Sequence, residues 1–278
     1  MPRIRRPARH PTMTVYAAPR DRGRANSQGD HVDPSLHPSR QLEPAPRLLI
    51  TAGPTHEPID AVRFIGNRSS GRLGLALASA AADRGWPVTL ALGPATLSCT
   101  DTRVQLLRFR TAADLAAILA HETPKCDVLV MAAAVADYRP KLDPEMNAEQ
   151  SKLRRTEQKL VLELEPTPDL LATVAKSRRP GQLIVGFALE PRERLLASAR
   201  EKLARKSIDL IVANPLETMN AETIEAHLLS RDGRHDSTPG AIEKTEFALW
   251  LLAKIEAHLL RSHAHAVTAR PAASPSPQ

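Results

Sequence analysis

Aromatic residues and cysteines are scarce in this chain. Phe, Tyr and Trp make up 3% of its 278 residues, so a packed core has to consist of aliphatic side chains and alanine. The two cysteines, Cys99 and Cys126, cannot form a framework of several disulfides, and neither lies at a metal-type spacing. We therefore expect free thiols in a reducing compartment, the cytoplasm. No uncharged apolar run approaches the roughly 20 residues that span a bilayer, which argues against a membrane protein.

Positive charge is concentrated at the ends of the chain. Lys and Arg number 38 against 31 Asp and Glu, and residues 1–46 contain eight Arg, eight Pro and four acidic residues without periodic apolar positions. Residues 263–278 are rich in Ala, Pro and Ser. Such segments bury too little surface to offset the entropy of ordering. We predict a disordered basic tail over 1–46, a folded domain over 47–262 and a second disordered tail over 263–278.

The basic tail leaves three further interpretations open. An arm of this charge attracts nucleic acid or a membrane surface. An Arg-rich transit peptide is conceivable, although the prolines oppose an amphipathic helix. Translation could also begin later, for instance at Met13. The simplest interpretation is a solvated tail, with no nucleic-acid and no membrane partner.

Strand-like and helix-like segments alternate between residues 47 and 262. Short apolar or β-branched runs predict strands at 47–51, 87–92, 104–109, 126–135, 160–164, 183–187 and 209–213, with a late edge strand at 227–230. Helical patterns predict helices at 69–84, 111–121, 169–176, 193–207 and 245–260. Ser69 or Ser70 can cap the first helix, and Gly85 closes it.

The alternation predicts an α/β fold, Rossmann-like and doubly wound, in which helices cover both faces of a mainly parallel sheet. The continuous apolar run 126–135 is typical of a strand covered on both faces. Residues 140–157 lack apolar periodicity and are highly charged, which indicates a mobile loop. Ligands bind beyond the carboxyl ends of the strands in such sheets, and unusual polar residues follow four of these ends.

The first strand end leads through residues 51–74 into a helix. Gly53, Ser70 and Gly71 lie in this glycine- and serine-rich segment, which offers backbone N–H groups and a positive helix end to a phosphate. The 17 residues between Gly53 and Gly71 depart from the dinucleotide fingerprint, whose glycines share one tight turn. The alternative is that Gly71 and Gly74 only permit close packing of helix and sheet.

The other strand ends carry an aspartate, a phenylalanine and two lysines. Asp137 is either a functional carboxylate or a turn former, and Phe187 either stacks on a base or belongs to the core. Lys202 and Lys206 share one helix face, where they either bind a polyphosphate or face solvent. Lys152 begins a basic cluster in the charged loop. The histidines lack carboxylate or thiolate companions at ligand spacing, so we predict no structural metal.

Six motifs together resemble one enzyme family in order and spacing. They are TAGPTHEPIDAVRFIGNRSSGRLG, AAAVADYRP, SKLRR, TPDLLATVA, IVGFALE and KLARKSIDLIVANP, and the likeness covers about residues 47–260. The family is that of the bacterial, CTP-dependent phosphopantothenate–cysteine ligases of coenzyme A biosynthesis. The resemblance implies a Rossmann-like homodimer that uses CTP and Mg²⁺. CTP activates the carboxylate of 4′-phosphopantothenate as an acyl-cytidylate with loss of pyrophosphate, and the amine of L-cysteine then displaces CMP.

The resemblance also implies two groups of site residues. The acyl-cytidylate step is associated with Asn67, Arg63, Ala134 and the loop lysine Lys152. The nucleotide site is associated with Asp137, Phe187, Lys202 and Lys206, the lysines being expected on the phosphates.

Two departures from the family pattern bear on this interpretation. Thr167 replaces a frequent asparagine, and Arg154-Arg155 replace lysines, which keeps the charge but changes the donor geometry. In many bacteria the ligase follows a flavin-dependent decarboxylase in the same chain. Because 46 residues are too few for that domain, we expect a stand-alone ligase and a separate decarboxylase.

Two alternative functions share parts of this pattern. A short-chain nicotinamide oxidoreductase has the same architecture but needs Tyr-x-x-x-Lys on a helix. The nearest candidate, Tyr138 to Lys141, has the wrong spacing and contains Pro140, which opposes a helix. A nucleic-acid-binding protein would instead act through the basic tail.

Overall fold

The computed structural model describes residues 42–141, 152–155 and 157–268. Our predictions for the N-terminal tail up to residue 41, for loop residues 142–151 and for 269–278 lie outside these ranges. Within them Leu42 and Ala45 pack against the core, and the last helix runs to Thr268. The folded part therefore extends beyond 47–262 at both ends. None of the helices described is both long and apolar enough to cross a bilayer.

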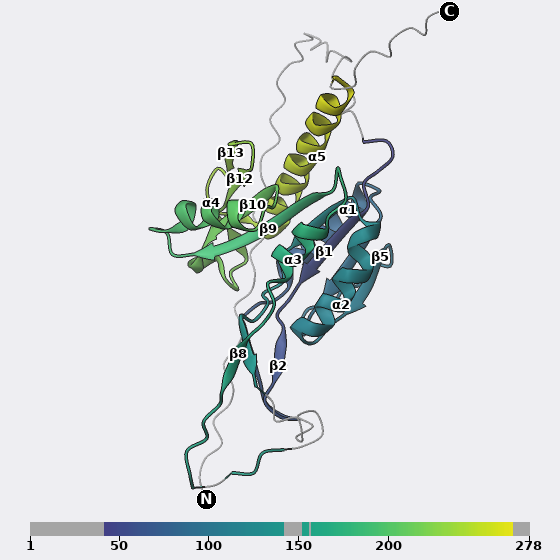
Figure 1. Ribbon diagram of the computed structural model, residues 1–278. Helices are drawn as coiled ribbons and strands as arrows, with labels where there is room; N and C mark the ends of the chain where they lie inside the picture. The colour runs from purple at the N-terminus through teal and green to yellow at the C-terminus, as the bar shows by residue number, and fades with distance from the viewer. Residues whose placement is uncertain (1–41, 142–151, 156, 269–278) are drawn as a thin grey trace, which may run out of the picture. The chain divides into compact units, whose positions relative to one another are not determined.

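An eight-stranded sheet forms the centre of the fold, in the order β13-β12-β10-β9-β6-β1-β4-β5 (Figure 1). Its strands are β1 (Leu48–Ala52), β4 (Val88–Leu92), β5 (Val104–Arg108), β6 (Val128–Met131), β9 (Leu183–Glu190), β10 (Leu210–Pro215), β12 (His227–Ser230) and β13 (His235–Ser237). All neighbours from β10 to β5 pair in parallel, whereas β12 and β13 are antiparallel. The doubly wound, mainly parallel fold is confirmed. The strand at 227–230 is not the edge strand, because β13 covers it.

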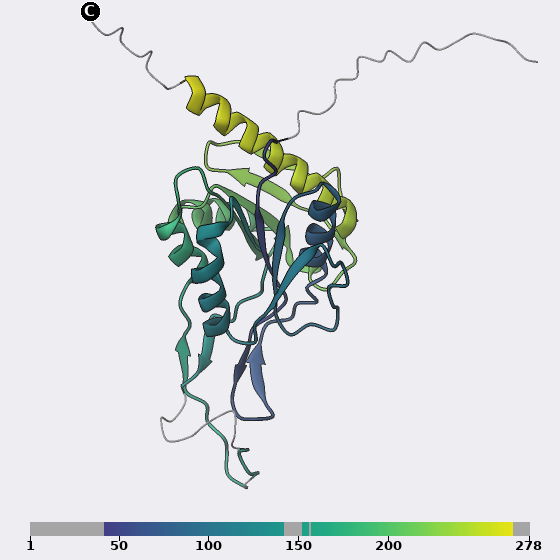
Figure 2. The same cartoon turned by 90° about the vertical axis from the view of Figure 1, so that its right-hand side faces the viewer.

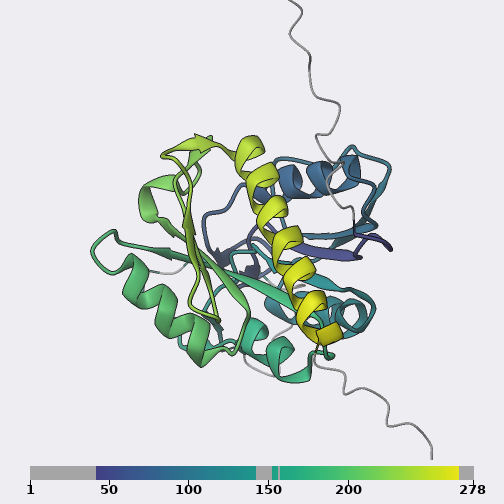
Figure 3. The same cartoon turned by 90° about the horizontal axis from the view of Figure 1, so that it is seen from above.

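Helices lie on both faces of the sheet (Figures 2 and 3). One face packs against α1 (Arg72–Asp83) and α5 (Lys244–Thr268). The other packs against α2 (Ala112–Glu122), α3 (Leu170–Ser177) and α4 (Leu195–Arg205). The sheet is therefore buried on both sides, which explains the nearly unbroken apolar runs of its strands.

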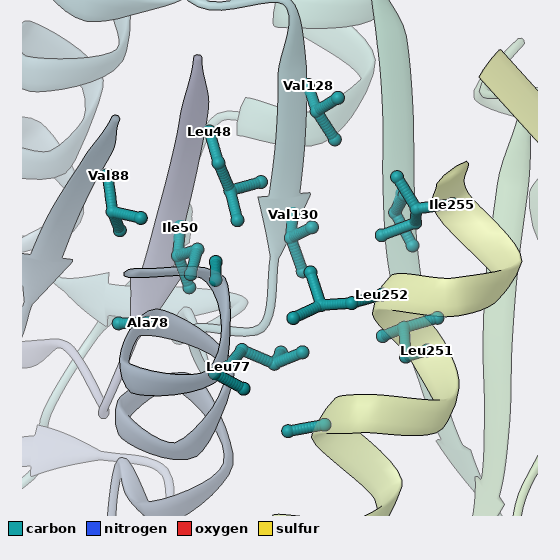
Figure 4. Close-up of a cluster of buried hydrophobic side chains, with 14 of the residues drawn as sticks. Leu48, Ile50, Leu77, Ala78, Val88, Val128, Val130, Leu251, Leu252 and Ile255 are labelled. Atoms are coloured by element: carbon teal, nitrogen blue, oxygen red, sulfur yellow. The ribbon is translucent and has the colours of Figure 1, made fainter. Parts of the chain in front are cut away.

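The core on the α1 and α5 face is almost entirely aliphatic. Leu77 of α1 and Leu252 of α5 lie near Ile50 and Val130 of the sheet (Figure 4), and each of these side chains is fully buried. Leucine, isoleucine, valine and alanine thus supply the buried apolar area that aromatic residues supply in many domains.

The helix ends follow the sequence signals at α2 and α3 but not at α1. Thr111 caps α2 and forms a capping box with Asp114, and Asp169 caps α3. At α1 the cap residue is Gly71, in the left-handed region at φ 72°, without a side-chain cap. The predicted serine cap is wrong in this respect. Ser70 Oγ only accepts a long 3.4 Å hydrogen bond from the Arg72 amide.

Two short antiparallel hairpins project from the carboxyl edge of the sheet (Figures 1 and 2). They pair β2 (His56–Pro58) with β3 (Phe64–Gly66), and β7 (Tyr138–Pro140) with β8 (Leu164–Pro166). The strand predicted at 126–135 ends at Met131, because small residues that contact the β1 turn follow it. The strand predicted at 160–164 is also wrong, since β8 begins at Leu164 and residues 160–163 are exposed and irregular.

Shorter elements complete the description. They are η1 (Thr123–Lys125), η2 (Leu216–Thr218) and a pair formed by β11 (Thr223–Ile224) and β14 (Ile242–Glu243). The elements η2, β11 and β14 lie between β10 and α5 in the chain, and the first residue of α5 lies at the carboxyl edge of the sheet.

Candidate functional site

A cleft of about 570 Å³ opens at the carboxyl edge of the sheet. The ends of β1, β6, β9 and β10 and the first turn of α1 contribute to its wall. The chain leaves β1 for β4 on one side and β6 for β9 on the other, so β1 and β6 flank the switch point of the topology. Doubly wound sheets bind their ligands at this place.

The first turn of α1 packs unusually close to the end of β1. A Cβ added to Gly74 would lie 2.3 Å from the Ala52 Cβ atom, so only glycine permits this approach. The packing interpretation is therefore confirmed for Gly74. Gly71 lines the cleft, and α1 has no acidic residue in its first turn and no side-chain cap. The positive end of the helix is thus available to an anion.

Asn67 lies on the cleft wall next to the segment that follows β6. Its Nδ2 atom donates a 2.9 Å hydrogen bond to the Val135 carbonyl oxygen. Ala134 bridges to Pro54, and the Ala136 amide donates to the hydroxyl of the fully buried Thr55. This small-residue segment is held rigidly and leaves room for a ligand to approach the backbone.

Lys202 and Phe187 also line the cleft. The Lys202 Nζ atom donates a 2.6 Å hydrogen bond to Glu190 Oε1, and the Lys202 side chain is 30% exposed. This hydrogen bond lowers the pKa of Glu190 below its usual range. Phe187 also contacts the core, so it belongs both to the cleft wall and to the hydrophobic cluster. Lys202 brings a positive charge to the cleft, part of which Glu190 neutralises.

Lys206, Asp137 and Gly53 do not line this cleft. Lys206 Nζ lies 2.8 Å from the carboxylate of Asp169, the cap of α3. Asp137 is exposed, and its carbonyl oxygen accepts a 2.9 Å hydrogen bond from the Thr167 amide. Gly53 adopts φ 79° in the turn behind Gly71. The structure therefore brings together Asn67, Ser70, Gly71, Ala134, Phe187 and Lys202.

Arg63 and Lys152 lie in a second hollow, formed with Val62 and residues 153–155. The Arg63 guanidinium pairs with Asp60 and donates a 3.0 Å hydrogen bond to the Leu153 carbonyl oxygen. Asp60 is 0% exposed and also accepts from the Leu153 amide at 3.1 Å. Arg63 holds the pKa of the Asp60 carboxyl well below its usual range. Arg63 and Asp60 thus anchor the segment that carries Lys152.

Sequence reasoning missed two residues. Asp60 lies inside the quoted glycine-rich motif, and its position after Pro58 was the available signal for a turn-stabilising carboxylate. Lys244 begins α5, lines the cleft and is 8% exposed. Burial lowers the pKa of Lys244, and the nearby positive charge of Arg72 lowers it further. No sequence pattern marked this lysine as different from the exposed ones.

Comparison with known proteins places the chain. Residues 45–259 match the family described as DNA/pantothenate metabolism flavoprotein C-terminal domain. The chain belongs to this family.

Within the described residues no group of three or more His, Cys, Asp or Glu side chains is placed to hold a metal ion.

The chain covers nearly all of one related structure but only about half of its curated relatives. A crystal structure of the C-terminal domain of the coenzyme A biosynthesis bifunctional protein CoaBC is 34% identical, with a TM-score of 0.65 over 78% of this chain and 96% of that one. A protein named cysteine/cysteine sulfinic acid decarboxylase, from an unknown prokaryotic organism, is 43% identical over 63% of this chain and 47% of its own length. The chain spans about half the length of the curated relatives it matches.

A more distant structure shares the fold. It is a Cab2 mutant in complex with phosphopantothenate-cysteine, 21% identical, with a TM-score of 0.67 over 80% of this chain and 88% of that one. At this identity the likeness supports the Rossmann-like architecture.

Proposed function

We propose that the family member is a CTP-dependent phosphopantothenate–cysteine ligase. The observation that carries the proposal is the convergence, in one cleft, of Asn67, Phe187 and Lys202 with the open positive end of α1. These residues come from motifs that resemble the ligase family, and the distant structural relative binds the product of such a reaction. The reaction joins 4′-phosphopantothenate to L-cysteine and yields 4′-phosphopantothenoylcysteine, CMP and pyrophosphate.

The chemistry requires an activated acid. A free carboxylate does not react with an amine at neutral pH, because the leaving group would be oxide. In the first step a carboxylate oxygen attacks the α-phosphorus of CTP, and the bond to pyrophosphate breaks. In the second step the cysteine nitrogen attacks the acyl carbon, CMP leaves with the bonding electron pair, and the amine loses a proton.

Negative charge develops on pyrophosphate during the first step. Lys202, Ser70, Gly71 and the first turn of α1 line the cleft, and in this proposal Lys202 and the first-turn amides stabilise this charge. Lys206 lies one helical turn from Lys202. In this proposal Lys206 leaves Asp169 and binds a phosphate as well. The Lys206–Asp169 ion pair is partly exposed, so breaking it costs about 1 kcal/mol or less. Gly53 supports the turn, and the resemblance assigns Asp137 to the nucleotide.

We propose that magnesium enters the cleft with the nucleotide, since no Asp or Glu among the described residues lines the cleft. Mg²⁺ commonly binds through substrate phosphates, waters and one or two carboxylates, so a dedicated protein cage is not needed. When bound, the ion neutralises charge on the phosphate oxygens. Preference for CTP over ATP is part of the proposal and rests on the resemblance.

Asn67 and Lys152 serve different steps. The Asn67 amide is fixed by Val135 and can orient the acyl carbonyl without adding a competing nucleophile. Lys152, in the hollow beside Arg63, adds positive charge to the acyl-cytidylate step, as the resemblance implies. Arg63 contributes by anchoring this segment, and the small side chain of Ala134 leaves space for the acyl group.

Exposed apolar side chains on the two hairpins support a homodimer. Phe64 and Tyr138 are exposed on β3 and β7, and Val161, before β8, is 85% exposed. Apolar patches of this kind usually mark protein interfaces. A cytoplasmic location, a separate flavin-dependent decarboxylase and the absence of nucleic-acid partners stay predictions.

Pyrophosphate release tests the proposed function. The protein is incubated with 4′-phosphopantothenate and either CTP or ATP, with and without L-cysteine. We expect CTP-dependent pyrophosphate release and, with cysteine, one amide per CMP. Release of CO₂ from cysteine alone, or NADPH binding without CTP binding, would instead support a decarboxylase or a nicotinamide oxidoreductase.

A further inference from the structure

Lys244 is a buried cation at the edge of the cleft. The residue is 8% exposed, and its Nζ atom donates a 3.3 Å hydrogen bond to the Thr218 carbonyl oxygen. Among the described residues no carboxylate forms a hydrogen bond or an ion pair with it. A buried ammonium group without an anionic partner is costly, because it has lost its hydration. The position calls for an anion that the protein itself does not supply.

Two further positive features lie beside this lysine. Arg72 is the first residue of α1, lines the same cleft and is close enough for its charge to lower the pKa of Lys244. Its ion-pair partner, Glu222, is 3.7 Å away and 76% exposed, so this pair is weak. The first turn of α1 adds amides with no side-chain cap and no acidic neighbour.

We infer that Lys244, Arg72 and the first-turn amides of α1 form a phosphate subsite of the cleft. The three features come from different elements, and each favours a compact anion with several acceptor oxygens. The inference rests on the proposed function, whose substrates carry phosphate in two places. These are the triphosphate of the nucleotide and the 4′-phosphate of phosphopantothenate, and the experiment separates them.

Substitution of Lys244 by methionine tests the subsite directly. Lys244→Met keeps the apolar stem that the surroundings bury and removes the charge. Binding of inorganic pyrophosphate and of inorganic phosphate is measured by calorimetry on the full-length protein. We expect pyrophosphate or phosphate to bind about tenfold more weakly or worse, the loss typical of a charge-assisted hydrogen bond. Lys176→Met, on the exposed surface of α3, is the matched control and should bind as the wild type does.

A purely structural role would give a different result. Thermal unfolding without ligand should show Lys244→Met to be at least as stable as the wild type, because an uncompensated buried charge is removed. The rise in melting temperature caused by pyrophosphate should be lost. Should Lys244→Met fail to fold, Arg72→Gln, at a partly exposed position, carries the same binding test. Binding unchanged in the folded variant, or no saturable binding of either anion by the wild type, overturns the inference.

Steady-state kinetics identify the source of the phosphate. If the subsite holds the triphosphate, Lys244→Met raises KM for CTP about tenfold or more and leaves KM for phosphopantothenate near its wild-type value. If it holds the 4′-phosphate, KM for phosphopantothenate rises instead, and the preference over pantothenate falls. Both KM values unchanged would overturn the inference. If the wild type forms no amide, the proposed function fails, and the calorimetric comparison still decides the subsite.

Discussion

Removal of the Lys202 charge should weaken the use of CTP. Lys202 lines the cleft, its side chain is 30% exposed, and its Nζ atom lies 2.6 Å from Glu190 Oε1. A hydrogen bond to a charged group contributes about 1.5–3 kcal/mol, or roughly 10- to 150-fold in kcat/KM. Since Glu190 neutralises part of the lysine charge, Lys202→Met should fall near the lower end of this range.

Glu190→Gln should act in the opposite direction. The substitution leaves Lys202 in place and removes the carboxylate that competes with a phosphate for its ammonium group. The pair is partly exposed, so freeing the lysine should be worth about 0.2–1 kcal/mol and should lower KM for CTP by up to about fivefold.

Initial rates of pyrophosphate release at varied CTP measure both effects. Phosphopantothenate is kept saturating, and Lys176→Met is the control for loss of an exposed lysine. A decrease below about threefold in Lys202→Met would refute its placement on the phosphates, since a single charge-assisted contact should cost more.

Three further substitutions separate the steps and the anchoring of the loop. Asn67→Asp should leave pyrophosphate release measurable but reduce amide yield about 100-fold or more, because the substitution removes a preorganised hydrogen-bond donor. Normal amide yield in a product assay would exclude the role of Asn67. Lys152→Gln should abolish pyrophosphate release itself, and unimpaired release in the coupled assay would remove Lys152 from the first step. Asp60→Asn should lower the melting temperature at neutral pH. Because folding lowers the pKa of Asp60, its stabilising effect is complete above about pH 4 and is lost as pH falls toward the lowered value. A wild-type and an Asp60→Asn protein with the same pH profile of melting temperature would contradict this.

Local signals were sufficient for the main elements of the fold. Apolar runs located the central strands, and the helical pattern at 111–121 located α2, which Thr111 and Asp114 cap in the structure. The hairpin strands were missed because each contains three residues, too few for an alternating pattern to show. The strand predicted at 126–135 was too long, because the alanines that follow β6 are as apolar as the strand itself.

Contacts between distant residues limited the prediction of the site. Lys202 and Lys206 are equivalent in the sequence pattern, yet one lines the cleft and the other pairs with Asp169, 37 residues away. Arg63 belongs to the same motif as Asn67, but Asp60 turns it toward Leu153. Lys244 lines the cleft and contacts Thr218 of η2, 26 residues earlier in the chain, and no local sequence pattern indicates this contact.

Detection of the acyl-cytidylate tests the central claim most directly. The protein is mixed with CTP, 4′-phosphopantothenate and Mg²⁺ in the absence of cysteine, quenched and analysed by mass spectrometry. The account predicts a phosphopantothenoyl cytidylate. This species should disappear when cysteine is added, while CMP and the amide form. Amide formation without this species, or no cytidylate under any of these conditions, would contradict it.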